Sequence, residues 1–180
     1  MLQIYVPGVD GWDEVKEEFV SLPGTNLVLE HSLISISKWE SKWHIPFLGK
    51  DQKTPEQVID YIKCMTITPN VKAEVYDCLT RENIDQVMAY IEDPMTATTI
   101  TDRNGRRASR EVVTSELIYY WMVALEIPFE CQKWHINRLM MLIQICSIKN
   151  QPDKKMSKKS TAQQNAMLNA ARRHKSHTRG

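Results

Sequence analysis

Short apolar stretches near the N-terminus predict two strands with a helix between them. In residues 2–6 (LQIYV), apolar and polar positions alternate loosely before a Pro-Gly pair, which is typical of a strand that ends in a turn. Residues 27–36 (LVLEHSLISI) are rich in Leu and β-branched residues, which favours a second strand. Between them, residues 12–20 place apolar side chains at helical spacing, and this pattern predicts a helix of two turns.

The central part of the chain predicts helices with clear starts. Residues 54–57 (TPEQ) fit a capping box, in which the Thr54 hydroxyl accepts from the backbone N–H of Gln57. The apolar positions that follow have the spacing of an amphipathic helix. A short second helix is expected over residues 71–79, and Thr80 is expected to cap a third.

Two stronger helices are predicted in the last third of the chain. Thr114 caps a helix over residues 115–126, whose apolar side is expected to carry Leu117, Tyr120, Trp121 and Ala124. A second helix is expected over residues 128–148, and the short link predicts an antiparallel pair. The predicted fold is therefore α+β and predominantly α-helical, with a small N-terminal β-sheet packed on a helical bundle and a basic C-terminal helix or tail.

Charge divides the chain into two parts. Residues 151–180 hold eight basic residues and one acidic residue, a net charge of +7, which leaves −6 for residues 1–150. We expect an acidic, mostly helical globular domain over residues 1–150 and a basic tail over residues 151–180, helical when bound. Such a tail suits an anionic partner, either nucleic acid or an acidic protein surface. A solvated tail that docks on its own acidic domain is the alternative.

Composition excludes several classes of protein. The chain has 180 residues, of which 42% are hydrophobic, enough for one domain with a real core. No apolar run approaches the roughly 20 residues that span a bilayer, so no membrane association is expected. The N-terminus does not have the pattern of a signal peptide. The four cysteines are too widely spaced for paired zinc ligands, and we expect reduced thiols, no bound metal and no cofactor.

The motifs of common enzymes are not found in the sequence. The six glycines do not form a phosphate-binding loop, and no Gly-x-Ser-x-Gly elbow occurs. The histidines stand apart from metal-ligand spacings, and His31 and His135 are expected to be structural. The sequence therefore predicts a binding or assembly protein, not an enzyme, with no catalytic residues.

Three groups of residues are candidates for binding a partner. The aromatic cluster Trp39, Trp43 and Phe47 suits either a binding platform or core packing. A hairpin is plausible over residues 95–113, where arginines around an Asn-Gly turn form either an anion-binding finger or a solvated loop. The candidate basic residues of the hairpin and the tail are Arg103, Arg106, Arg107, Lys154, Lys155, Lys158, Lys159, Arg172 and Arg173.

One distinctive block resembles small proteins encoded by tailed bacteriophages and prophages. The block is residues 29–48, LEHSLISISKWESKWHIPFL. The same proteins are similar to this chain at YIKCMT, PMTATT, IPFECQKWH and NAARR, which are residues 61–66, 94–99, 127–135 and 169–173. The resemblance covers roughly 150 positions from about residue 28 onward, and the chain resembles the siphophage tail assembly chaperone family.

This resemblance implies a non-enzymatic helper in the host bacterial cytoplasm. Such chaperones bind the phage tape measure protein and bring tail tube protein to it, and no ligand or catalytic residue is carried over. A homo-oligomer is left open. One alternative is a structural or head–tail connector component of the virion, with its arginines near the genome. The other is a nucleic-acid-binding protein that uses the basic tail.

Overall fold

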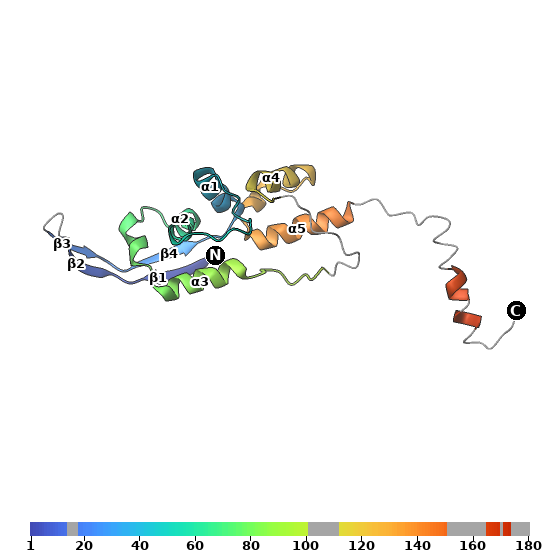
Figure 1. The fold of residues 1–180 in the computed structure, drawn as a ribbon, viewed down its shortest axis with the longest axis horizontal. Coiled ribbons are helices and arrows are strands. Elements are labelled where there is room, and N and C mark those ends of the chain that lie inside the picture. The colour runs from blue at the N-terminus through green and yellow to red at the C-terminus, as the bar shows by residue number, and fades with distance from the viewer. Residues whose placement is uncertain (14–17, 101–111, 151–164, 170, 174–180) are drawn as a thin grey trace. The chain divides into compact units, whose positions relative to one another are not determined.

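A computed structural model of the chain describes residues 1–13, 18–100, 112–150, 165–169 and 171–173 (Figure 1). The chain divides into two units, Met1–Cys146 and Ser147–Gly180. The division falls close to the predicted boundary at residue 150, inside the last long helix. In the second unit, residues 165–169 and 171–173 are helical and exposed. All sheets and the hydrophobic core described below belong to the first unit.

Four strands form a long antiparallel ribbon at the N-terminus. Strand β1 (Leu2–Val6) pairs with β4 (Thr25–Leu29), and β2 (Val9–Asp13) pairs with β3 (Glu18–Leu22). In Figure 1 the β2–β3 pair continues the β1–β4 pair away from the helices. The two pairs meet where the backbone approaches itself closely, since a Cβ added at Gly8 would lie 2.6 Å from the carbonyl oxygen of Leu22.

The helix predicted over residues 12–20 is wrong. Its described ends belong to β2 and β3, with Trp12 opposite Phe19 in the antiparallel register, and residues 14–17 lie outside the described residues. A helix of two turns fixes many dihedral angles for few hydrogen bonds, so it is marginal by itself. In the hairpin, the backbone N–H and C=O groups of β2 bond to those of β3 instead. The spacing of the apolar residues does not reveal this pairing.

The strand predicted over residues 27–36 is correct only in its first part. Strand β4 ends at Leu29, and helix α1 (Leu33–Trp43) follows after a short bend. Ser32 and Ser35 form a capping box: Ser35 Oγ accepts from the Ser32 N–H at 2.9 Å, and Ser32 Oγ accepts from the Ser35 N–H at 3.5 Å. This cap starts a helix in a stretch whose β-branched residues favour a strand.

The predicted helix starts in the middle of the chain are confirmed. Helix α2 (Pro55–Met65) begins with both bonds of its capping box, at 2.9 and 3.3 Å between Thr54 and Gln57. Helix α3 (Arg81–Glu92) begins after Thr80, and the segment before it is the 3₁₀ helix η1 (Ala73–Cys78).

The described residues 112–150 contain α4 (Ser115–Ala124), the 3₁₀ helix η2 (Phe129–Lys133) and α5 (Ile136–Lys149). The single helix predicted over residues 128–148 is therefore wrong, because it is interrupted at Trp134 and His135. His135 leaves the helical path to form an isolated bridge with Ser32, and the Ile136 N–H donates to the His31 carbonyl at 2.9 Å.

The core lies where the helices meet the β1–β4 pair. Helix α3 packs against β1, while α1 contacts α2, α4 and η2. The largest fully buried apolar side chains come from β4, α1, α2, α4 and α5: Leu27, Leu29, Leu33, Ile36, Trp39, Ile62, Met65, Ile118, Met122, Ile136 and Leu139. The predicted α+β, predominantly helical class is confirmed. Among the described residues, no helix has the length and apolar character needed to cross a membrane.

Candidate partner-binding site

The predicted aromatic cluster faces inward. The Trp39 ring is 0% exposed, and its Nε1 donates to the Gln57 carbonyl at 3.0 Å. Phe47 is also buried and meets the Trp39 ring edge-on, with ring centroids 5.2 Å apart. Trp43 is half-buried and donates to Asp60 at 2.8 Å. The rings of Trp39 and Phe47 thus pack α1 against α2 and leave little surface for a partner.

Glu40 lies next to these rings and is buried although it carries a carboxylate. One of its oxygens accepts from the Phe47 N–H at 2.7 Å, and the other accepts from the Ser115 N–H at 2.8 Å. Ser115 is the first residue of α4, where the helix dipole favours a negative charge. One side chain therefore joins α1, the loop after it and the start of α4.

Asp60 provides a second polar link between α1 and α2. Lys42 forms an ion pair with one oxygen of Asp60, and Trp43 donates to the other. Burial alone would raise the pKa of the Asp60 carboxyl. The hydrogen bonds from Lys42 and Trp43 outweigh that effect, so the pKa lies below its ordinary value.

Two buried histidines, His31 and His135, pack against each other in the core. His31 Nδ1 lies 2.5 Å from the Tyr61 hydroxyl, and the His31 and His135 ring centroids are 4.9 Å apart. His135 Nδ1 accepts from the Asn137 N–H at 3.3 Å, and its Nε2 faces the Tyr90 carbonyl at 2.9 Å. The neutral Nε2–H tautomer of His135 satisfies both partners. These contacts are those of core histidines, as the sequence predicts.

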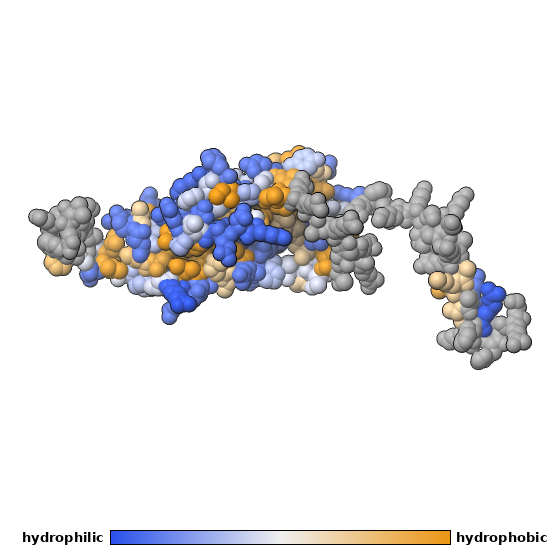
Figure 2. All heavy atoms as spheres, in the orientation of Figure 1, coloured by the Kyte–Doolittle hydropathy of each residue, from blue (hydrophilic) through white to orange (hydrophobic). Residues whose placement is uncertain are grey.

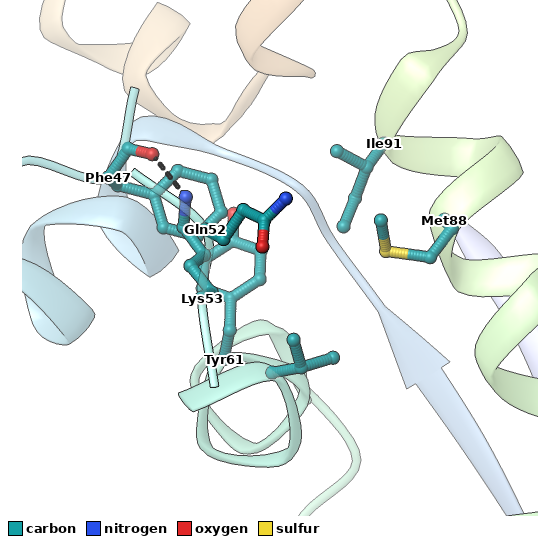
Figure 3. A pocket seen from close by; sticks show the side chains of 7 residues that line it. Phe47, Gln52, Lys53, Tyr61, Met88 and Ile91 are labelled. Atoms are coloured by element: carbon teal, nitrogen blue, oxygen red, sulfur yellow. Dashed lines mark hydrogen bonds between the residues drawn. The ribbon is translucent and has the colours of Figure 1, made fainter. Parts of the chain in front are cut away.

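A groove opens between α2 and α3, and of its lining residues only Phe47 was a predicted candidate for binding a partner. Its cavity volume is about 390 Å³, and it is lined by Phe47, Gln52, Lys53, Val58, Tyr61, Met88 and Ile91 (Figure 3). Lys53 Nζ donates to the Phe47 carbonyl at 2.7 Å and lies 4.5 Å from the centre of the Phe47 ring. The groove is therefore lined mainly by apolar side chains and contains the cation of Lys53.

Helix α4 and η2 expose a second apolar surface, which we call the α4 face. It consists of Tyr120, Val123 and Phe129, which are 64%, 62% and 54% exposed. Figure 2 shows apolar side chains at the surface over α4. Exposed carboxylates flank the α4 face, namely those of Glu116, Glu126 and Glu130.

The predicted apolar side of α4 is correct only for Leu117 and Trp121, which are partly buried. Its buried apolar residues are Ile118 and Met122, whereas Tyr120 and Ala124, which were expected on the apolar side, are exposed. The error arises because α4 is apolar nearly all round, so its residue pattern does not identify the inward side. Helix α4 has more apolar residues than one buried side can hold, so some of them must be exposed. This surplus is the feature of the sequence that could have indicated the α4 face.

The predicted basic residues lie mostly outside the described residues. This holds for the hairpin arginines Arg103, Arg106 and Arg107 and for the tail lysines Lys154, Lys155, Lys158 and Lys159. Residues 95–100, the described start of the predicted hairpin, contain no strand. Arg172 and Arg173 lie in the exposed helical segment of the second unit.

Thiol and metal chemistry add little to this region. All four cysteines are free thiols, and Cys131 is buried while the others are partly buried. Within the described ranges, no three His, Cys, Asp or Glu side chains are grouped so that they could hold a metal ion.

Comparison of the chain with protein families, with curated proteins and with solved structures finds no match in any of the three.

Proposed function

We propose that this chain is a non-enzymatic tail assembly chaperone of a tailed bacteriophage, active in the host cytoplasm. It binds the tape measure protein and assists assembly of the tail tube. The α4 face is the observation that carries this proposal, because its apolar side chains Tyr120, Val123 and Phe129 are each more than half exposed. The resemblance of residues 29–48 to tail assembly chaperones supports the same function.

The chemistry of the α4 face suits a helical client. An amphipathic helix lays its apolar positions against an apolar surface, and aromatic side chains contribute most of the binding free energy at such contacts. Tyr120 and Phe129 supply these aromatic groups. The surrounding carboxylates of Glu116 and Glu130 would accelerate the approach of a segment with basic residues between its apolar ones.

The proposal is tested by recovering partners from phage-producing cells. A tagged chain is purified after nuclease treatment, and the bound proteins are identified by mass spectrometry. Recovery of a very long, helix-rich phage protein, with or without tube protein, is the expected result. The double variant Tyr120→Ser, Val123→Ser should lose this protein, whereas Ile67→Ser, which changes an exposed apolar residue elsewhere, should retain it.

The basic tail supports a second candidate, a virion component or nucleic-acid-binding protein. Residues 151–180 carry a net charge of +7, and phosphate neutralisation of this size gives an affinity that falls steeply with salt. Recovery of portal, connector or capsid proteins in the same experiment would favour the virion component. Material that is bound without nuclease treatment and lost after it would favour nucleic acid as the partner.

A further inference from the structure

The groove between α2 and α3 has two apolar walls that face each other. Val58 and Tyr61 come from α2, while Met88 and Ile91 come from α3. Figure 3 shows Met88 and Ile91 projecting from α3 toward the side of the groove that carries Tyr61 and Lys53. Met88 is 42% exposed, so this wall is open to solvent. The volume of about 390 Å³ lies within the range of roughly 300–1,000 Å³ that is usual for ligand sites.

The groove holds a cation, the Lys53 ammonium group, beside two aromatic rings. Among its described lining residues, Lys53 alone is charged, and its Nζ lies between the Phe47 carbonyl and the rings of Phe47 and Trp39. An ammonium group has three N–H donors, and the Phe47 carbonyl takes one of them. Burial lowers the pKa of Lys53 although the nearby Asp51 carboxylate acts in the opposite direction. The charge is therefore poorly hydrated and suited to an added anionic partner.

We infer that this groove binds a helix of a partner protein, which inserts a large apolar side chain between Met88 and Tyr61 and presents a carboxylate to Lys53. The two groups lie one turn apart on the partner helix, since residues at i and i+4 point to the same side. The inference rests on the proposed function, because it assigns the chemistry by which a helical client is held.

A carboxylate fits the groove better than the alternatives. Phosphate is usually held by several donors or by a planar Arg fork, and the groove offers one ammonium group. A basic ligand would meet the charge of Lys53 in a partly desolvated place. The flexible thioether of Met88 adapts to apolar side chains of different shape, which suits a client with many similar helical segments.

The experiment uses the full chain with isotope-labelled methyl groups of Met and Ile and two matched helical peptides. Both peptides are Ala-based and carry one Leu, and they differ only at the position four residues later, which is Glu in one and Lys in the other. The Glu peptide should shift the methyl resonances of Met88 and Ile91 and bind about tenfold more tightly. Lys53→Met should remove this preference, and Lys50→Met, which changes an exposed lysine outside the groove, should leave it unchanged.

Other outcomes would overturn the inference. Equal affinity for both peptides, or a preference that survives Lys53→Met, would exclude recognition of a carboxylate by Lys53. Shifts confined to residues outside the groove would exclude the site. If hexanoate bound more tightly than the Glu peptide, the occupant would be a small apolar acid and not a helix. These measurements use purified protein and do not depend on the recovery of partners from cells. Binding of the Glu peptide would therefore support the groove even if the recovery experiment found no tail protein.

Discussion

His31 Nδ1 and the Tyr61 hydroxyl oxygen lie 2.5 Å apart in the core, and the edge of the His135 ring packs against His31. His31 is 1% exposed, and burial lowers its pKa from the ordinary value of 6.5 to about 3, with His135 adding to the effect. Burial also lowers the pKa of His135, against the opposing hydrogen bond to the Tyr90 carbonyl. The folded chain therefore holds two neutral imidazoles under conditions in which the unfolded chain protonates them.

We predict that the chain loses stability as the pH falls below 6.5. The pKa of His31 is lower in the folded state, so the unfolded state binds more protons between pH 6.5 and about 3. At 1.36 kcal/mol per pKa unit, His31 alone lowers the free energy of unfolding by about 2 kcal/mol from pH 7 to pH 5. Urea denaturation at the two pH values measures this change. A flat profile for the native chain would contradict the prediction.

Glu40→Gln should destabilise the fold by about 2 kcal/mol. The carboxylate accepts one main-chain N–H at each oxygen, from Phe47 and from Ser115. A glutamine amide has one oxygen, so its NH₂ group would face a buried N–H that has lost its acceptor. Chemical denaturation measures the loss, with Glu116→Gln as an exposed control that should change stability by less than about 0.5 kcal/mol. Equal effects of the two substitutions would show that Glu40 does not hold this junction.

The orientation of α4 predicts a large loss of stability for one residue and a small change for another residue two positions away. Ile118→Ala should reduce the free energy of unfolding by about 3 kcal/mol, because the fully buried side chain leaves a cavity. Tyr120→Ala should change it by less than about 0.5 kcal/mol, because this side chain is mostly exposed. Denaturation of both variants in the same buffer tests the assignment. A larger loss for Tyr120→Ala than for Ile118→Ala would reverse the orientation.

The glycines of the N-terminal ribbon predict another matched pair. Gly8→Ala would bring a Cβ within 2.6 Å of the Leu22 carbonyl oxygen and 2.7 Å of the Gly24 nitrogen, so the backbone must shift. We expect a loss of about 1–3 kcal/mol, the usual effect of overpacking. A Cβ at Gly11 meets no atom within 4 Å, so Gly11→Ala should be tolerated. Thermal unfolding of the two variants provides the comparison, and similar midpoints would contradict the close approach at Gly8.

Local signals explain which elements could be predicted. Thr54, Thr80 and Thr114 cap helices through hydrogen bonds to residues three positions later, so their sequence neighbours contain the necessary information. Strands β2 and β3 are neighbours in the sequence, but the spacing of their apolar residues also fits a helix. The interruption at His135 depends on its bridge to Ser32, which lies far away in the sequence. The α2–α3 groove has the same origin, since Tyr61 and Met88 belong to different helices and neither has a local pattern that indicates a site.

The block at residues 29–48 directs Trp39, Glu40 and Phe47 into the interior. Proteins that contain this block should therefore share the packing of α1 against α2. Under the proposed function, the residues that choose a partner lie outside the block. Residues such as Tyr120 and Met88 lie on the exterior, where replacement disturbs packing little. The chain is therefore a starting point for retargeting: its exterior could be diversified and selected against new helical proteins while the block is left intact.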